Sequence, residues 1–393
     1  MDYFKASLDR HRETKGKIEV SSRMRLESVE DLSLAYTPGV ARPCEEIARD
    51  PLSAWDLTWK GRTVAVVSDG SAVLGLGNLG GMASLPVMEG KAALFSEFGG
   101  VDAVPIVLAT QDEDEIIQTV RAIAPTFGGI NLEDISAPRC FRIEESLQDL
   151  GIPVLHDDQH GTAIVLLAAL INATRITGVA LSNLSVVING AGAAGRAIAA
   201  LLCCQSTDDR CIPVGKVRIC DSKGIISPSR GDLDVYKRDL AQWTNPDDEQ
   251  GSMRDALRGA HVFIGVSKGN LLNGDDIRSM ADDPIVLAMA NPTPEIMPDE
   301  AEAAGARIIG TGRSDFPNQV NNVLAFPGLF RGALEARATK FSAAMKFAAI
   351  EAIADATGEL SPRRILPPVF DRSVAVAVAD RVAAAARDSG ACL

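Results

Sequence analysis

The stretch SVVINGAGAAG, residues 185–195, decides the fold of this chain. Its first half is apolar and predicts a buried strand, and three glycines follow at the spacing G-x-G-x-x-G. The Ala-rich run after them, residues 196–202, predicts a helix. A strand, a glycine-rich turn and a helix in this order are typical of the first βα unit of a dinucleotide-binding domain.

Each position of the glycine motif has its own physical role. Gly190 permits a tight turn, Gly192 lets the backbone approach a pyrophosphate, and Gly195 lets the helix lie close to the strand. The start of the helix, with Ala193 and Ala194, supplies backbone N–H groups and positive potential for phosphates. We therefore expect these five residues to bind a dinucleotide cofactor, in preference to forming a glycine-rich turn without a ligand.

The next predicted strand bears on which cofactor is bound. KVRICD, residues 216–221, ends in Asp221, whose carboxylate can bind the ribose hydroxyls of NAD and would repel the 2′-phosphate of NADP. Lys223 follows two residues later and could pair with that phosphate instead. The sequence therefore leaves NAD and NADP open.

Apolar runs on both sides of the motif extend this pattern to two α/β domains. Predicted strands cover residues 63–68, 102–108, 128–134, 152–158, 184–190, 216–221, 260–267, 283–292 and 306–312, and helical segments alternate with them. We expect an N-terminal α/β domain over residues 1–160. A doubly wound, Rossmann-type domain is expected over residues 161–393, including a mostly helical C-terminal part, residues 331–388.

The composition excludes several classes of protein. A net charge of −13 argues against nucleic acid and anionic membranes as partners. Seven cysteines without CxxC spacing predict reduced thiols in an intracellular protein. The N-terminus is charged, unlike a signal peptide, and the longest strongly apolar run, residues 161–174, is shorter than the roughly 20 residues of a membrane span. We therefore expect a soluble, cytoplasmic protein.

Two pairs of acidic residues mark the ends of successive predicted strands. Glu133 and Asp134 end the first of these strands, and Asp157 and Asp158 end the second. A helix-like stretch separates the strands, so the unit is βαβ and both carboxyl ends lie at one edge of a parallel sheet. Carboxylates are the ligands that Mg²⁺ and Mn²⁺ prefer. The acids therefore predict a divalent cation site, although a single such pair is more often solvated loop charge.

HDDQHGTA, residues 156–163, also holds two of the four histidines of the chain, His156 and His160. Imidazoles can bind metals, but a magnesium or manganese site does not need them. The sequence therefore favours supporting roles for both histidines, with ligation as the alternative.

Seven stretches of this sequence resemble the motifs of malic enzymes, in the order and spacing of the compact bacterial form. They are SLAYTPGVA (33–41), SDGSAVLGLGNLG (68–80), PVMEGKAALF (86–95), GGINLEDI (128–135), HDDQHGTA (156–163), GAGAAG (190–195) and MANPTPEI (289–296). The resemblance covers roughly residues 15–335. It implies oxidative decarboxylation of L-malate to pyruvate and CO₂ with NAD or NADP, Mg²⁺ or Mn²⁺, and a homodimer or higher homo-oligomer.

The resemblance also implies roles for single residues. Lys91 would be the general base, with Asp157 beside it, and Tyr36 the general acid. The metal ligands would be Glu133, Asp134 and Asp158, and the residues that hold substrate or cofactor would include Asn291, Asn321 and Asn322.

Substrate anchoring is the point at which this chain departs from the larger, eukaryotic-type enzymes. Those enzymes carry an arginine just before the LGLG motif, where this chain has Val73. Backbone N–H groups of the glycine-rich loop, residues 75–81, are therefore the candidates for binding a malate carboxylate, Gly75 and Gly77 among them.

The implied chemistry sets a requirement on each of the two catalytic side chains. Lys91 can take the proton of the C2 hydroxyl only if its pKa falls well below about 10.4. Burial and a nearby cation lower the pKa of a lysine, whereas Asp157 raises it. Tyr36 precedes Pro38 and Gly39, which would hold its ring on a stiff turn. Without the resemblance, Lys91 would equally fit a surface lysine with a buried stem, and Tyr36 a core or interface tyrosine.

Two other functions fit the same motifs. A malolactic enzyme would use bound NAD and release lactate without net NADH. A nucleotide-binding regulator would keep the fold and lose catalysis, but the intact set of Tyr36, Lys91, Glu133, Asp134 and Asp158 argues against it.

Overall fold

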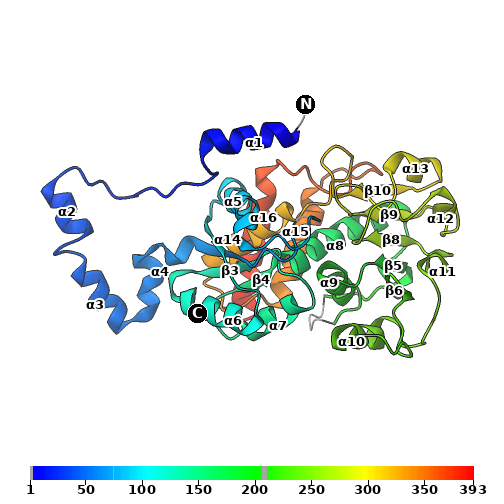
Figure 1. Cartoon of the computed structure of the whole chain (residues 1–393), viewed down its shortest axis with the longest axis horizontal. Coiled ribbons are helices and arrows are strands. Elements are labelled where there is room, and N and C mark those ends of the chain that lie inside the picture. Colours follow the sequence, from blue (N-terminus) through cyan, green and yellow to red (C-terminus); the bar gives the residue numbers. More distant parts are fainter. Residues whose placement is uncertain (1–2, 74, 206–209) are drawn as a thin grey trace.

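Two sheets, one parallel and one mostly parallel, are joined by one long buried helix in the computed structural model, which describes residues 3–73, 75–205 and 210–393 (Figure 1). Leu74, in the quoted stretch 68–80, lies outside the described residues. The first sheet has the strand order β2-β1-β3-β4, and all its strands are parallel. Its strands are β1 (Thr63–Ser68), β2 (Asp102–Val107), β3 (Gly129–Leu132) and β4 (Val154–His156).

Helices connect the strands of the first sheet, as a parallel sheet requires. They are α5 (Gly81–Leu94), α6 (Glu113–Ile123) and α7 (Arg139–Ser146). Every residue of β1 is buried, in keeping with its Val-rich sequence. Asp112 caps α6 by accepting from the backbone N–H groups of Asp114 and Glu115, and the acidic residues of the first turn suit the helix dipole.

The second sheet has six strands in the order β10-β9-β8-β5-β6-β7. Its strands are β5 (Ser185–Asn189), β6 (Lys216–Asp221), β7 (Gly224–Ile225), β8 (Val262–Gly265), β9 (Ile285–Ala288) and β10 (Ile308–Thr311). Its helices are α9 (Ala193–Leu202), α10 (Val235–Thr244), α11 (Met253–Leu257), α12 (Gly274–Arg278) and α13 (Pro298–Ala303). Only the short β7 runs antiparallel to its neighbour among these described strands. The prediction of a second, doubly wound α/β unit is confirmed.

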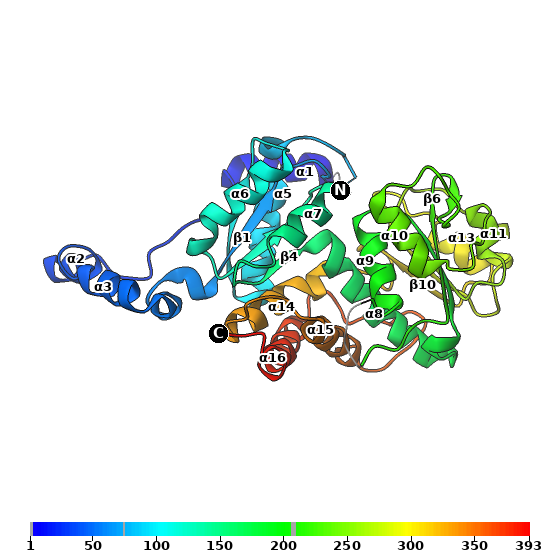
Figure 2. The same ribbon diagram turned by 90° about the horizontal axis from the view of Figure 1, so that it is seen from below.

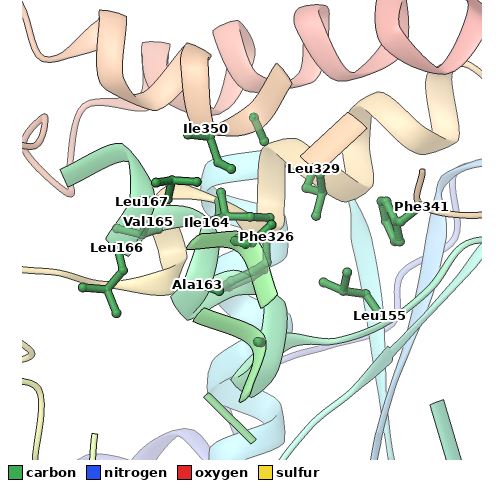
Figure 3. Close-up of a cluster of buried hydrophobic side chains, with 14 of the residues drawn as sticks. Leu155, Ala163, Ile164, Val165, Leu166, Leu167, Phe326, Leu329, Phe341 and Ile350 are labelled. Atoms are coloured by element: carbon green, nitrogen blue, oxygen red, sulfur yellow. The ribbon is translucent and has the colours of Figure 1, made fainter. Parts of the chain in front are cut away.

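The long helix α8 (Asp157–Thr177) leads from the first sheet to the second and lies in the core. Figure 3 shows Ala163, Ile164 and Val165 of this helix within a cluster that includes Phe326 and Ile350. The helix ends at Gly178, whose φ of 73° suits a left-handed cap. Within the described residues, α8 is the one helix long and apolar enough to cross a membrane, but 61% of its most apolar window is buried inside the protein, as in a core helix.

Three C-terminal helices lie beneath the first sheet (Figure 2). They are α14 (Phe326–Glu335), α15 (Ala343–Ala356) and α16 (Arg372–Asp388). Phe326 and Phe330 of α14 pack on Phe95, with ring centroids 4.7 and 5.3 Å apart. The helical character of this region was expected, but its packing against the first domain was not, because such long-range contacts leave no local pattern in the sequence. The boundary near residue 160 stays a prediction.

The N-terminal segment includes an arm, the part with its second and third helices, that extends away from the body, whereas its first helix lies near α5 (Figures 1 and 2). It carries α1 (Tyr3–Thr14), α2 (Val29–Ala35), α3 (Ala41–Arg49) and α4 (Ala54–Leu57). None of the residues in the first three of these helices is buried. The arm therefore has no core of its own within one chain.

The expectation that all seven cysteines are reduced is wrong for one pair. Cys204 and Cys211 form a disulfide, with their Cα atoms 5.7 Å apart. This Cα distance lies within the range that a disulfide spans. Cys44, Cys140, Cys203, Cys220 and Cys392 are free.

Candidate active site

Three carboxylates meet at the carboxyl edge of the first sheet. Glu133 and Asp134 follow β3, and Asp158 is the second residue of α8, directly after β4. One ligand atom from each lies within 4.8 Å of the other two. Because β3 and β4 are parallel neighbours, their ends meet as the sequence predicted. This edge of the sheet therefore holds three carboxylates that lie close enough together to bind one cation.

The electrostatics of the cluster suit a divalent cation. Burial raises the pKa of Glu133, and burial also raises the pKa of Asp158, to about 6. Asp158 is held in place by the backbone N–H of Asp134, 2.8 Å away. Asn131 donates its amide to Glu133 at 2.8 Å and leaves its own buried Oδ1 without a hydrogen-bond partner in the described structure. A bound Mg²⁺ or Mn²⁺ would offset the repulsion between these acids, so the residues fit such an ion.

Lys91 of α5 points into the same cluster. Its Nζ lies 2.7 Å from Asp157 Oδ2 and 2.9 Å from Glu133 Oε1, and the Phe326 ring covers it at 4.2 Å. Burial by itself lowers the pKa of Lys91, but Asp157 and Glu133 outweigh it and raise the pKa above its ordinary value. Asp157 thus lies against Lys91 as expected. With both acids charged, Lys91 holds its proton.

Asp157 is fully buried and is fixed on three sides. Besides Lys91, the amide of Asn322 donates to its Oδ2. A Cβ at residue 161 would lie 2.0 Å from Asp157 Oδ1, so only glycine fits there. Burial raises the pKa of Asp157 to about 6. Nothing in the sequence indicated the contact of Gly161 with Asp157.

The glycine motif has the geometry that its spacing predicted. Gly190 has a φ of 125°, and a Cβ there would lie 2.6 Å from the Val266 carbonyl oxygen. A Cβ at Gly195 would lie 1.7 Å from the Gly190 carbonyl oxygen, so strand and helix need both glycines. A Cβ at Gly192 would meet nothing, so open space remains beside the start of α9, where a pyrophosphate can approach.

Asp221 ends β6 but is already paired. Arg230 donates to both of its oxygens at 2.9 and 3.1 Å, and Lys237 to one at 3.0 Å. Lys223 instead donates its Nζ to Asp232 at 2.8 Å. The sequence analysis missed Arg230 and Lys237, because they are 9 and 16 residues downstream and share no motif with Asp221.

A cavity lies between the nucleotide loop and α7. Its volume is about 280 Å³, and its lining includes Gly192, Arg196, Tyr236 and Lys237. Two cationic side chains thus border the open side of Gly192, as expected where the phosphates of a dinucleotide bind.

The glycine-rich loop of the first domain reaches the second domain. A Cβ at Gly75 would lie 3.0 Å from the backbone oxygen of Asn291, and Gly75 and Gly77 have φ angles of 75° and 83°. The Asn291 amide lies against Gly312, where a Cβ would be 2.8 Å away. The loop and Asn291 therefore lie side by side between the domains. Asn321 caps a short 3-10 helix by accepting from Val323 N–H, so that oxygen is occupied.

Tyr36 is the one predicted catalytic residue that a single chain does not bring to the cluster. It follows α2, which lies on the arm (Figure 2), and its side chain is 66% exposed. The sequence does not indicate whether Tyr36 and Lys91 of one site come from the same subunit.

A second buried ion pair supports the glycine-rich loop and was not foreseen. Asp69, fully buried after β1, accepts from Arg139 at 3.0 Å and from the hydroxyl of Ser71 at 2.6 Å. Nothing in the sequence near Asp69 pointed to an arginine 70 residues away.

Comparison with known proteins gives the same assignment for both domains. The family described as malic enzyme, N-terminal domain, matches residues 15–148, and the family described as malic enzyme, NAD binding domain, matches residues 159–387. The bifunctional malic/malolactic enzyme of Bacillus subtilis is 54% identical over 98% of this chain and 93% of its own length. The NADP-dependent malic enzyme of Escherichia coli is 45% identical over 95% of this chain, which spans 51% of that protein.

The fold agrees with the sequence comparison. The crystal structure of the NAD-dependent malic enzyme from Thermotoga maritima is 47% identical and superposes with a TM-score of 0.92, covering 96% of this chain and 98% of that one. The chain therefore belongs to the malic enzyme family.

Proposed function

We propose that this protein oxidises and decarboxylates L-malate to pyruvate and CO₂, with NAD or NADP as the hydride acceptor and Mg²⁺ or Mn²⁺ as the metal. One observation carries the proposal: a buried Lys91–Asp157 pair adjoins the three carboxylates Glu133, Asp134 and Asp158. The helix that begins with these aspartates leads directly to the dinucleotide-binding domain.

The acidic cluster and Lys91 have separate roles in the reaction. Glu133, Asp134 and Asp158 would hold the cation, which would supply Lewis-acid polarisation of the C2 oxygen of the substrate and offset the negative charge that develops there. Lys91 Nζ takes the proton of the C2 hydroxyl while hydride leaves to the nicotinamide. If Glu133 shared its charge with a cation, it would attract Lys91 less, and the pKa of Lys91 would then be raised less by its neighbours.

The exposed tyrosine supports a proposal about assembly. Tyr36 is the general acid that returns a proton to C3 of enolpyruvate, and within one chain it faces solvent. Its arm also exposes Leu32, Leu34 and Val40, an apolar surface of the kind that marks protein contacts. We infer a homodimer or higher homo-oligomer in which the arm of one subunit docks on another, so that Tyr36 of the partner subunit completes the site.

Cofactor and substrate binding follow from the same residues. The glycine motif and the cations near Asp221 hold the dinucleotide. Asn291, Asn322 and the backbone of Gly75 and Gly77 orient the substrate carboxylates. A small-molecule substrate and a cytoplasmic location, without nucleic acid or membrane partners, complete the proposal.

A malolactic reaction is the second candidate, because one relative carries both activities in its name. Absorbance at 340 nm with malate, Mn²⁺ and either NAD or NADP separates the two reactions. We expect the absorbance to rise when malate is added, and we expect EDTA to abolish this rise. Formation of lactate without a rise in absorbance would establish the malolactic reaction. If malate is not converted at all, both enzymatic functions are excluded, and a nucleotide-binding regulator remains.

A further inference from the structure

A cluster of one buried and two half-buried side chains beside the two aspartates has no part in the chemistry proposed above. It consists of Glu144 on α7, His160 on α8 and Lys346 on α15. These three helices belong to segments far apart in the sequence, and the cluster joins them at the start of α8. Two of its members lie outside the family motifs quoted above, so its role must be argued from contacts.

Glu144 binds the first turn of α8 at three points. It accepts from the backbone N–H of His156 at 3.1 Å, from Gln159 Nε2 at 2.9 Å and from His160 Nε2 at 2.9 Å. His156 is the N-cap of α8, and its side chain makes no capping hydrogen bond. Glu144 therefore supplies, from another helix, the acceptor that a capping-box residue would give to the N-cap N–H.

Lys346 determines which atom donates in the contact between His160 and Glu144. Its Nζ lies 3.1 Å from His160 Nδ1, and a lysine ammonium can only donate, so Nδ1 is the acceptor. A neutral imidazole then carries its proton on Nε2 and donates it to Glu144. The chain of contacts from Lys346 through His160 to Glu144 thus has one consistent set of donors and acceptors.

The turn held in this way carries the two aspartates. Successive residues of a helix point about 100° apart, so one rotation of the first turn sets the direction of both side chains. In the observed setting Asp157 meets Lys91 at 2.7 Å, and Asp158 accepts from Asp134 N–H at 2.8 Å within the acidic cluster. A different rotation would lose both contacts together.

We propose that Glu144, supported by His160 and Lys346, is a positioning residue that fixes the rotation of the first turn of α8 and so sets the affinity of the acidic cluster for its cation. The inference rests on the proposed cation site and goes beyond it, because Glu144 itself touches neither the cation nor the substrate. Hydrogen bonds that orient metal-binding residues in this way typically alter metal affinity about 10- to 100-fold when they are removed.

The space around Lys346 allows substitutions that separate hydrogen bonding from packing. A cavity of about 260 Å³ borders the cluster, lined in part by Phe141, Gln148 and Arg196 together with Lys346. An arginine at position 346 therefore has room and still donates to His160, whereas methionine fills similar space and donates nothing. Glu144→Gln keeps the shape of the side chain but turns one of its acceptors into a donor, so at least one of the three contacts is lost.

The experiment measures binding of Mn²⁺ alone to EDTA-treated full-length protein, by calorimetry and by the spin-resonance signal of free Mn²⁺. Glu145→Gln, an exposed acid one residue further along α7, is the matched control. We expect Glu144→Gln to weaken Mn²⁺ binding about 10- to 100-fold. Lys346→Met should weaken it in the same direction, and Lys346→Arg and Glu145→Gln should bind like the unaltered protein. The KM for the dinucleotide should change by less than about twofold, because the cluster lies outside the glycine motif.

The outcomes separate this proposal from the proposed function. If the unaltered protein binds no Mn²⁺, the proposed cation site itself fails. If it binds Mn²⁺ and both Glu144→Gln and Lys346→Met bind it equally tightly, the positioning role is refuted, even if the melting temperature falls. If Glu144→Gln does not fold, Lys346→Met and its rescue by Lys346→Arg decide the question in the same way.

Discussion

Lys91 Nζ lies 2.7 Å from Asp157 Oδ2, and both side chains are buried. Lys91→Ala removes the proposed base and leaves Asp157 without its cation. We expect kcat for malate oxidation to fall about 10²- to 10⁴-fold, the usual contribution of a general base. The exposed Lys340→Ala is the control and should keep full activity. Malate-dependent turnover that persists in Lys91→Ala would show that another group takes the proton.

The contact between Gly161 and Asp157 predicts that Gly161 does not tolerate substitution by a residue with a side chain. Gly161→Ala would place a Cβ 2.0 Å from Asp157 Oδ1, so the aspartate or the helix must shift. Overpacking of this kind costs about 1–3 kcal/mol, and the displaced Asp157 should also lower kcat. Gly231→Ala, where a Cβ meets no atom, serves as the control. Equal melting temperatures and equal kcat for the two variants would contradict this account of Gly161.

The ion pairs of Asp221 with Arg230 and Lys237 predict how the preference between NAD and NADP can be changed. Asp221→Ser removes the charge that repels a 2′-phosphate and releases Lys237, and in part Arg230, which still pairs with Asp232, to bind it. The ratio of kcat/KM for NADP to that for NAD should rise about tenfold, corresponding to about 1.4 kcal/mol. Lys237→Ala should change the ratio in the opposite direction. A ratio that stays constant in both variants would place cofactor selection elsewhere.

The acidic cluster predicts a dependence of metal binding on pH. Burial raises the pKa of Asp157 and of Asp158 to about 6, so Asp158 becomes protonated below that value and ceases to be a ligand. Affinity for Mn²⁺ should therefore decline as the pH falls through about 6, at up to about tenfold per pH unit. Calorimetric titrations across this range provide the measurement, and an affinity that is constant down to acid pH would exclude Asp158 as a ligand.

The same shifts predict the sign of a stability change in the metal-free protein. Both aspartates bind protons more tightly in the folded state than at the ordinary pKa of 3.8, so the folded state holds more protons between the two values. The free energy of unfolding contributed by these groups should fall as the pH rises from about 4 to about 6. Urea melts in EDTA test this, and saturating Mn²⁺ should reverse the loss.

The exposed position of Tyr36 predicts complementation between two inactive variants. If Tyr36 acts across the subunit interface, unfolding and refolding Tyr36→Phe together with Lys91→Ala gives mixed dimers with one complete site. Half of the dimers are mixed, so about one quarter of full activity should return. Each variant refolded alone provides the control. No recovery in verified mixed dimers would place Tyr36 and Lys91 of one site in the same subunit.

Local patterns predicted much of this structure. The Val-rich run at residues 63–68 and the glycine motif at 190–195 gave correct elements, because strand burial and tight turns depend on neighbouring residues. Parallel topology then explains why Glu133 and Asp158 meet. The contact of Asp221 with Lys237 and the packing of Phe326 on Phe95 depend on tertiary structure alone. Sequence spacing carries no such information, so these contacts could not be foreseen.

The position of α8 constrains how this protein can be recombined. The two family matches end and begin at residues 148 and 159, so Asp157 and Asp158 fall between them. A chimera joined anywhere in that interval draws Glu133 from one parent and the body of α8 from the other. If the junction falls before Asp157, the proposed cation ligands Glu133 and Asp158 then come from different parents. The domains can be exchanged as modules only if the whole helix, with both of its aspartates, travels with the sheet whose edge it completes.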